Sequence, residues 1–182
     1  MSRKVHGDEH QLTAQALMFT ANVCCHQGRF DMALGLFEEA LGIQMQVLGH
    51  DHSDVADTLS NMAMVQQNQG KHAEALKGCK EALRVFKMRL GDEHVRVASA
   101  HHNIALLHKI QGKLAKALKG YTEALRIYTK VLGPEHPHVA NALGSISSLY
   151  LEQGKTREAL EFLEQALRIS KKRLGHEHPQ VA

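Results

Sequence analysis

Histidine is the side chain in this sequence with the most evident capacity for chemistry, because the 182 residues include 14 of them. Imidazole nitrogens bind zinc and other transition metals. The histidines form closely spaced pairs, namely His50 and His52, His101 and His102, His136 and His138, and His176 and His178. Each pair offers two ligands, but no cysteine or carboxylate set completes a tetrahedral site around any of them.

The positions of five histidines argue against a shared metal ion. The sequence places a histidine every 42 residues, at His10, His52, His94, His136 and His178. Equivalent positions on neighbouring repeats lie at least about 8–10 Å apart, whereas ligands lie about 2 Å from their metal ion. We therefore predict that this histidine begins the first helix of each repeat, capping it or packing in the turn, and we predict no metal or cofactor.

The sequence also lacks the motifs of common enzyme classes. It contains no HExxH, and its GKxxEAL-like strings do not have the spacing of a phosphate-binding loop. Serine, histidine and aspartate residues are spread over repeated helix faces and form no convergent catalytic set. Cys24, Cys25 and Cys79 are odd in number and show no CxxC spacing, a pattern typical of buried reduced thiols. We predict that the protein is not an enzyme.

These side chains must be positioned by a 42-residue repeat that runs through the whole sequence. Similar blocks begin at Gly7 (GDEHQLTA), Gly49 (GHDHSDVA), Gly91 (GDEHVRVA), Gly133 (GPEHPHVA) and Gly175 (GHEHPQVA). Self-similarity at such a period indicates a solenoid in which each unit packs against its neighbours. We predict a single array over residues 1–182, with repeats at about 7–48, 49–90, 91–132 and 133–174, and the start of a further repeat at 175–182.

Each repeat is predicted to form two amphipathic helices, because its apolar residues recur in steps of three and four. A Gln-Gly pair ends each first helix and a Leu-Gly pair ends each second helix, since glycine adopts the left-handed cap conformation at little cost. Pro137 and Pro179 fit the first turn of a first helix. We expect first helices near 11–27, 53–69, 95–111 and 137–153, and second helices near 29–48, 71–90, 113–132 and 155–174.

The spacing of small residues resembles the tetratricopeptide repeat, whose usual length is about 34 residues. Ala21, Ala63, Ala105 and Ser147 are each followed 12 residues later by alanine, then by a bulky residue and a further alanine. The longer period and the LGxEHPxVA string are similar to the variety found in kinesin light chains. The resemblance implies an all-α fold, a right-handed α-α superhelical solenoid of four helix-turn-helix repeats, with the first helices lining a concave groove.

The resemblance also implies a non-enzymatic scaffold for protein-protein interactions. In many such arrays the groove holds an extended peptide or a partner helix, and in the kinesin light chain group it binds cargo adaptors, often through acidic segments. Asparagines that commonly bond the ligand backbone match Asn61 and Asn103, whereas Phe19 and Ser145 depart from that pattern. The groove residues implied are Met18, Phe19, Asn22, Asp57, Ser60, Asn61, Met64, His102, Asn103, Leu106, Lys109, Asn141 and Ser148.

This lining of amides, hydroxyls and methionines suits backbone hydrogen bonding and adaptable apolar contact, although a solvated face is the alternative. Among the predicted first helices only Arg96 and Lys109 are basic, so we expect no strong cationic clamp for acidic peptides. Positive charge gathers instead on a predicted second helix, at Lys77, Lys80, Arg84 and Lys87. Such a stripe either attracts acidic proteins, anionic lipid or phosphate or is a solvated face.

The composition narrows the partners further. The formal net charge is +3, and the basic stripe has no interleaved aromatic residues, which argues against nucleic acid as a partner. No stretch reaches the roughly 18 apolar residues of a membrane span, and the N-terminus MSRKVHGDEHQ lacks the apolar core of a signal peptide. We predict a cytoplasmic protein with a protein or peptide ligand and no membrane insertion.

The ends of the sequence also carry expectations. Residues 1–6 fit the tail of a second helix from an earlier block, and residues 179–182 begin a first helix. Solenoids need polar capping repeats, and neither end has one, so we expect a longer array or ends covered by self-association or a partner. The alternative function is therefore a structural or self-assembling repeat segment, or the sensor array of a larger signalling protein.

Overall fold

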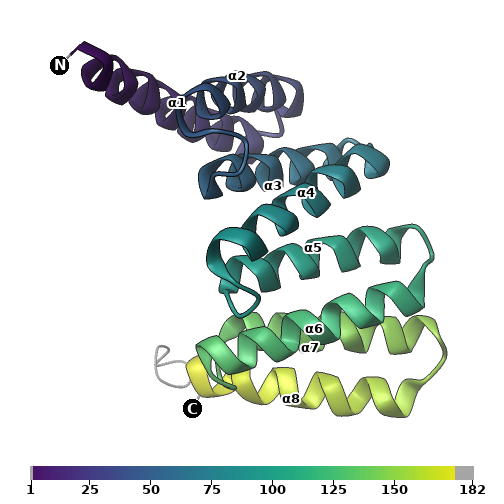
Figure 1. Ribbon diagram of the computed structural model, residues 1–182. Coiled ribbons are helices and arrows are strands. Elements are labelled where there is room, and N and C mark those ends of the chain that lie inside the picture. Colours follow the sequence, from purple (N-terminus) through teal and green to yellow (C-terminus); the bar gives the residue numbers. More distant parts are fainter. Residues whose placement is uncertain (1, 175–182) are drawn as a thin grey trace. The chain divides into compact units, whose positions relative to one another are not determined.

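The computed structural model describes residues 2–174, with side chains from 10 to 172, and these residues form helices joined by short turns (Figure 1). The first helices of the four repeats are α1 (Ser2–His26), α3 (Ser53–Asn68), α5 (Val95–Ile110) and α7 (Pro137–Glu152). The second helices are α2 (Phe30–Leu48), α4 (His72–Leu90), α6 (Leu114–Leu132) and α8 (Thr156–Leu174). The prediction of an all-α fold built from helix pairs is confirmed.

The chain divides into two compact units whose boundary coincides with a repeat boundary, the first at Met1–Gly91 and the second at Asp92–Ala182. In the first unit α1 packs on α2, α2 on α3 and α3 on α4. In the second unit α5 packs on α6, α6 on α7 and α7 on α8. Each unit therefore holds two helix pairs, and each helix packs on its neighbours in sequence.

The ends of seven helices agree with the predicted ends to within one residue, but α1 does not. The predicted first helix begins near residue 11, with a turn at Gly7 and the tail of another helix before it, whereas α1 runs from Ser2 through Gly7 and His10. That part of the prediction is wrong. Glycine inside a helix costs only about 1 kcal/mol relative to alanine, so Gly7 alone does not interrupt α1.

Glycine ends the helices as the sequence predicts. Gly28, Gly70, Gly112 and Gly154 have φ of 73°, 76°, 71° and 73°. The N–H of the residue after each glycine donates to a carbonyl five residues earlier, as from Lys71 to Gln66 at 2.8 Å, which satisfies the last carbonyls of the helix. After the second helices, Gly49, Gly91 and Gly133 combine φ of 83°, 80° and 87° with ψ of 162°, 169° and 159°, a region open essentially to glycine alone. Gly175 and Pro179 lie outside the described residues.

The repeated histidine caps three first helices. Nδ1 of His52, His94 and His136 accepts the backbone N–H two residues later, at 3.2, 3.1 and 3.2 Å. The bond satisfies one of the free N–H groups of the first turn. The prediction is confirmed at these positions and wrong at His10, which lies inside α1, while His178 lies outside the described residues.

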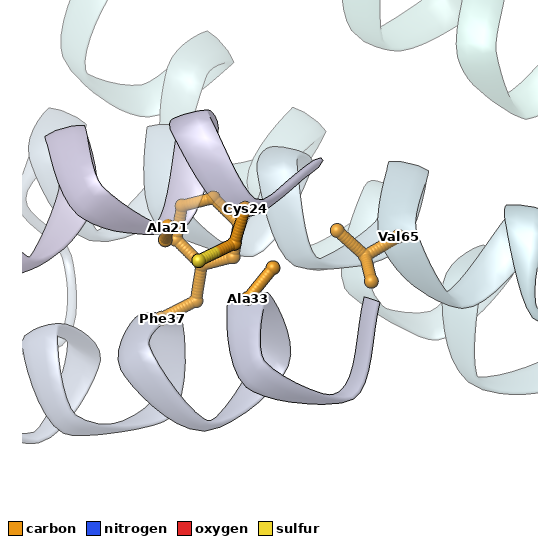
Figure 2. Packing of buried hydrophobic residues seen from close by; sticks show 5 residues of the cluster. All are labelled: Ala21, Cys24, Ala33, Phe37 and Val65. Carbon is orange, nitrogen blue, oxygen red and sulfur yellow. The ribbon is translucent and has the colours of Figure 1, made fainter. Parts of the chain in front are cut away.

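The core of each unit forms where a first helix covers the preceding helix pair. In the first unit the buried cluster contains Ala21 and Cys24 of α1, Ala33 and Phe37 of α2, and Val65 of α3 (Figure 2). In the second unit it contains Ala105 of α5, Ala117 and Tyr121 of α6, and Ile146 and Leu149 of α7. Phe37 and Tyr121 occupy the same position two 42-residue steps apart, as do Val65 and Leu149, so the sequence repeat is also a repeat of packing.

Candidate ligand-binding groove

An open groove lies in the second unit, where α5 and α7 run beside each other over α6. Its cavity has a volume of about 480 Å³ and is lined by His102, Leu106, Lys109, Tyr121, Ala140, Asn141, Gly144, Ser145 and Ser148. The α5 residues are four and three positions apart, and residues 141, 144, 145 and 148 of α7 are similarly spaced. Such steps place side chains on one face of a helix, so the groove is built from two facing helix stripes.

The charge of Lys109 is compensated inside the groove. Its Nζ donates to Oγ of Ser148 at 2.6 Å and lies 3.0 Å from Oε1 of Glu152. The Lys109 side chain is 22% exposed and that of Glu152 is 43% exposed, so solvent partly screens the pair. The groove therefore presents polar groups with little net charge, in agreement with the expected lack of a strong cationic clamp.

His102 and Tyr121 form the aromatic part of the groove. Their rings meet edge to face, with centroids 4.9 Å apart and planes inclined by 64°. Burial lowers the pKa of His102, and the nearby charge of His138 lowers it further, so the imidazole is neutral at pH 7. Burial raises the pKa of Tyr121 to about 12, against the effect of a hydrogen bond with Ser145. Both rings thus offer uncharged donors and acceptors.

In the first unit the corresponding face is formed by α1 and α3. Phe19 and Met64 are 73% and 53% exposed, and Asn22 is exposed. Asp57, Ser60 and Asn61 are half-buried. Met18 is also half-buried, because it packs against the core and its Sδ lies 3.2 Å from Oγ1 of Thr58. This face has two exposed apolar side chains beside amides and a hydroxyl, the same mixture of groups as in the second unit.

The described residues form an assembly of helix pairs. Within residues 2–174, no three His, Cys, Asp or Glu side chains come together as a metal site would require. None of the described helices has the length and hydropathy needed to cross a bilayer. The groove has the features of a binding surface, namely concavity, a few apolar walls and convergent polar groups.

Sequence comparison identifies the repeat. The sequence model of the tetratricopeptide repeat matches residues 13–76, 54–118 and 96–172. The chain belongs to the tetratricopeptide repeat family. Tetratricopeptide repeats serve as scaffolds for protein-protein interaction, and this coarse function applies to the chain. A search of curated protein sequences gave no match.

Solved structures of tetratricopeptide-like repeats share the fold. BtubC (BKLC) from P. vanneervenii superposes with a TM-score of 0.82 at 23% identity, over 95% of this chain and 68% of that one. Nearly identical repeats of a putative kinesin light chain from Podosopora anserina give a TM-score of 0.70 at 23% identity, over 88% and 76% of the two chains. MamA gives 0.63 at 17% identity, over 89% and 81%. The resemblance to kinesin light chain repeats is therefore confirmed at the level of the fold.

The groove brings together five of the residues predicted from the tetratricopeptide resemblance, namely His102, Leu106, Lys109, Asn141 and Ser148. Asn103 is half-buried on α5 and lies outside this lining. The prediction did not include Tyr121, which the alanine pattern places among packing residues. Tyr121 is 1% exposed and forms a hydrogen bond with Ser145 of α7, a contact between helices that the residue spacing within one helix does not reveal.

The basic stripe on the second helices of the tetratricopeptide repeats is partly neutralised. Arg84 bonds to Glu81 at 2.7 Å and to Asp51 at 2.5 Å. One repeat later, Arg126 bonds to Glu123 at 2.8 Å and to Glu93 at 2.9 Å. Hydrogen bonding by these arginines lowers the pKa of the Asp51 and Glu93 carboxyl groups. The paired arginines favour the interpretation of the stripe as a solvated face.

Proposed function

We propose that this chain is a non-enzymatic scaffold that binds an extended peptide segment or a partner helix along its first-helix faces. The observation that carries the proposal is the groove of about 480 Å³ between α5 and α7. Asn141, Ser148 and His102 supply both donors and acceptors for a peptide backbone, and Leu106 supplies an apolar wall. These groups recognise main chain and apolar side chains better than they recognise charge.

The kind of ligand follows from the groove and from the family. Similarity to kinesin light chain repeats supports binding of an adaptor or cargo segment in the cytoplasm. Because Lys109 is already paired with Glu152, a carboxylate of the ligand would have to displace Glu152 to reach it. We therefore propose a segment of low net charge as the ligand of the second unit, with main-chain hydrogen bonds and one or two apolar anchors.

The test fills the groove without disturbing the fold. A Cβ added at Gly144 meets no atom within 4 Å, so Gly144→Gln places a side chain in the groove and replaces a poor helix former by a good one. We expect a gain of about 0.5–1 kcal/mol in the free energy of unfolding. Gly35→Gln on α2 is the matched control, because Gly35 is exposed and a Cβ there also meets nothing within 4 Å.

The probe is a peptide selected from a random-sequence library on the immobilised wild-type chain, labelled with a fluorophore and titrated in solution. We expect the dissociation constant measured by anisotropy to rise at least about tenfold, or about 1.4 kcal/mol, for Gly144→Gln. Gly35→Gln should bind as the wild type does. Equal affinity of the wild type and Gly144→Gln for every selected peptide would place the ligand elsewhere and overturn the proposal.

The alternative function, a self-assembling repeat segment, is favoured by a different observation. The two ends of the array expose apolar faces that do not belong to the groove. Association through these faces can be measured without a peptide ligand.

A further inference from the structure

An apolar stripe on α8 is exposed. Leu160, Leu163 and Leu167 are 51%, 48% and 50% exposed and lie three and four positions apart, so they share one side of the helix. Leu163 is the repeat counterpart of Phe37 and Tyr121, which are 0% and 1% exposed. The same sequence position is thus buried on α2 and α6 and half-exposed on α8. We call Leu160, Leu163 and Leu167 the α8 face.

On α2 and α6, the residues equivalent to Leu163 are covered by a further helix, as the clusters around Phe37 and Tyr121 show. Figure 2 shows Val65 of α3 approaching the cluster that holds Phe37 of α2. In the second unit, Ile146 and Leu149 of α7 pack in the cluster of Tyr121 on α6. A first helix therefore covers this stripe on α2 and on α6. By analogy, the α8 face is expected to accommodate a first helix from another copy of the 42-residue repeat.

Such a helix is present at the other end of the chain, and its matching side is exposed. Val23 of α1 is the repeat counterpart of Val65 and Leu149 and is 53% exposed, whereas those two are 2% and 0% exposed. Ala16 of α1 is likewise exposed, and its counterpart Ala142 is fully buried on α7. Together with Thr20, these residues form a stripe in steps of four and three. We call Ala16, Thr20 and Val23 the α1 face.

The composition of α1 supports an apolar partner. From His10 to His26 this helix contains no Asp, Glu, Lys or Arg, and it also exposes Leu12 and Phe19, at 65% and 73%. A solvent-facing stretch of helix without Asp, Glu, Lys or Arg and with several exposed apolar side chains is typical of a surface that is covered in the working state.

We propose that the α1 face of one copy packs on the α8 face of a second copy, head to tail, as α3 packs on α2 and α7 on α6. The occupant is a second copy because the chain itself carries both complementary surfaces. A contact between two different faces is heterologous, so it propagates from copy to copy.

This contact is separate from the proposed groove. Val23 and Leu163 line no part of the groove, so loss of peptide binding and loss of association are independent results. The interface resembles one helix packed on another and is small, and small interfaces are weak. It is also apolar, so added salt should weaken it little, in contrast to a contact between exposed charges.

Sedimentation velocity of the 182-residue chain, from about 5 to about 500 µM as suits a weak interface, tests the proposal. The variants are Val23→Glu, which breaks the α1 face, and Leu163→Glu, which breaks the α8 face. Gln15→Glu and Gln165→Glu are the matched controls, because they add the same charge at exposed positions of the same helices. Circular dichroism confirms that each variant is folded.

The expected result is complementation. The wild type and both controls sediment faster as concentration rises, and each face variant alone remains monomeric. An equimolar mixture of Val23→Glu and Leu163→Glu associates again, because one variant keeps the α8 face and the other keeps the α1 face. The mixture stops at a dimer, since the remaining faces are both broken.

Three outcomes would overturn the proposal. One is a wild type that stays monomeric over the whole concentration range. Another is association of Val23→Glu alone, which would indicate a contact between two α8 faces. The third is failure of the mixture to associate while the wild type does, which would place the contact elsewhere on the chain.

Discussion

Gly120 allows α6 to approach α5 closely. A Cβ at this position would lie 2.9 Å from Cβ of Ala105 and 3.2 Å from the carbonyl oxygen of His101. Both distances are shorter than carbon contacts in packed interiors, which are about 3.5–4.0 Å. The neighbouring groups are backbone and a short side chain, so relief requires movement of a helix. A single missing methyl group therefore determines how these two helices pack.

Gly120→Ala should lower the free energy of unfolding by about 1–3 kcal/mol, because the added methyl group overpacks the contact. Gly35→Ala is the control. A Cβ there meets nothing within 4 Å, so alanine should stabilise α2 by about 0.5–1 kcal/mol through its better helix propensity. Urea unfolding followed by circular dichroism measures both. An equally stable Gly120→Ala chain would mean that α5 and α6 separate at little cost.

His102 should make stability depend on pH. Its folded-state pKa is lowered by burial and by His138, whereas the unfolded value is about 6.5. As the pH falls below this value, the unfolded chain binds the proton first, so the contribution of neutral His102 is complete above about pH 6.5 and is lost as the pH falls through the folded-state pKa.

Removing the His102 imidazole should therefore reduce the dependence of the free energy of unfolding on pH. His102→Gln should lose less stability than the wild type between about pH 7.5 and about pH 5, as measured by urea unfolding at both values. His10→Gln, at an exposed position of α1, is the control and should follow the wild type. The same acid-induced loss in His102→Gln and the wild type would assign the effect to other groups.

At the scale of the helices, one contact between α2 and α3 is built differently from its counterpart in the second unit. Gln44 and Thr58 are buried, and the Thr58 hydroxyl donates to Oε1 of Gln44 at 2.6 Å. Two repeats later these positions hold Tyr128 and Ala142, which are 3% and 0% exposed. The same helix pair can thus be joined by a buried polar pair or by an aromatic ring over alanine.

This difference predicts that a second substitution can restore the stability lost by a first. Thr58→Ala leaves the Gln44 oxygen without this donor and should cost about 1–3 kcal/mol. Adding Gln44→Tyr recreates the pairing of Tyr128 and Ala142 in the second unit. The double mutant should recover at least half of the free energy of unfolding that Thr58→Ala loses. Ser60→Ala is the control, since that hydroxyl bonds only within its own turn, to the carbonyl of Ala56 at 2.9 Å. A double mutant as unstable as the sum of its parts would show no coupling.

The helix ends could be predicted from sequence because they depend on local chemistry. A glycine with positive φ and a histidine cap act on their own turn, so Gly70 and His94 identify helix ends wherever the motif recurs. The start of α1 could not be predicted in this way, because α1 continues through the same motif at Gly7. Tyr121 was missed because its place in the groove lining depends on contacts with other helices, such as its hydrogen bond with Ser145 of α7.

At the scale of the whole molecule, the chain repeats one packing unit. The cluster around Phe37 and Val65 recurs around Tyr121 and Leu149 after two 42-residue steps. Helices pack on their neighbours in sequence within each unit. In such an architecture the free energy of unfolding is approximately a sum of the stabilities of single repeats and of the interfaces between neighbouring repeats. A substitution in one unit should therefore destabilise mainly that unit.

Native-state hydrogen exchange read by mass spectrometry tests this locality. Phe37→Leu should destabilise the first unit by about 1–2 kcal/mol and lower amide protection in α1, α2 and α3, while α6, α7 and α8 keep theirs. Tyr121→Leu should produce the converse pattern, which controls for a difference in intrinsic stability between the units. If both substitutions lower protection evenly across all eight described helices, the two units unfold together. The coupling between neighbouring repeats would then exceed the stability of a single repeat, because only strong coupling spreads a local defect along a solenoid.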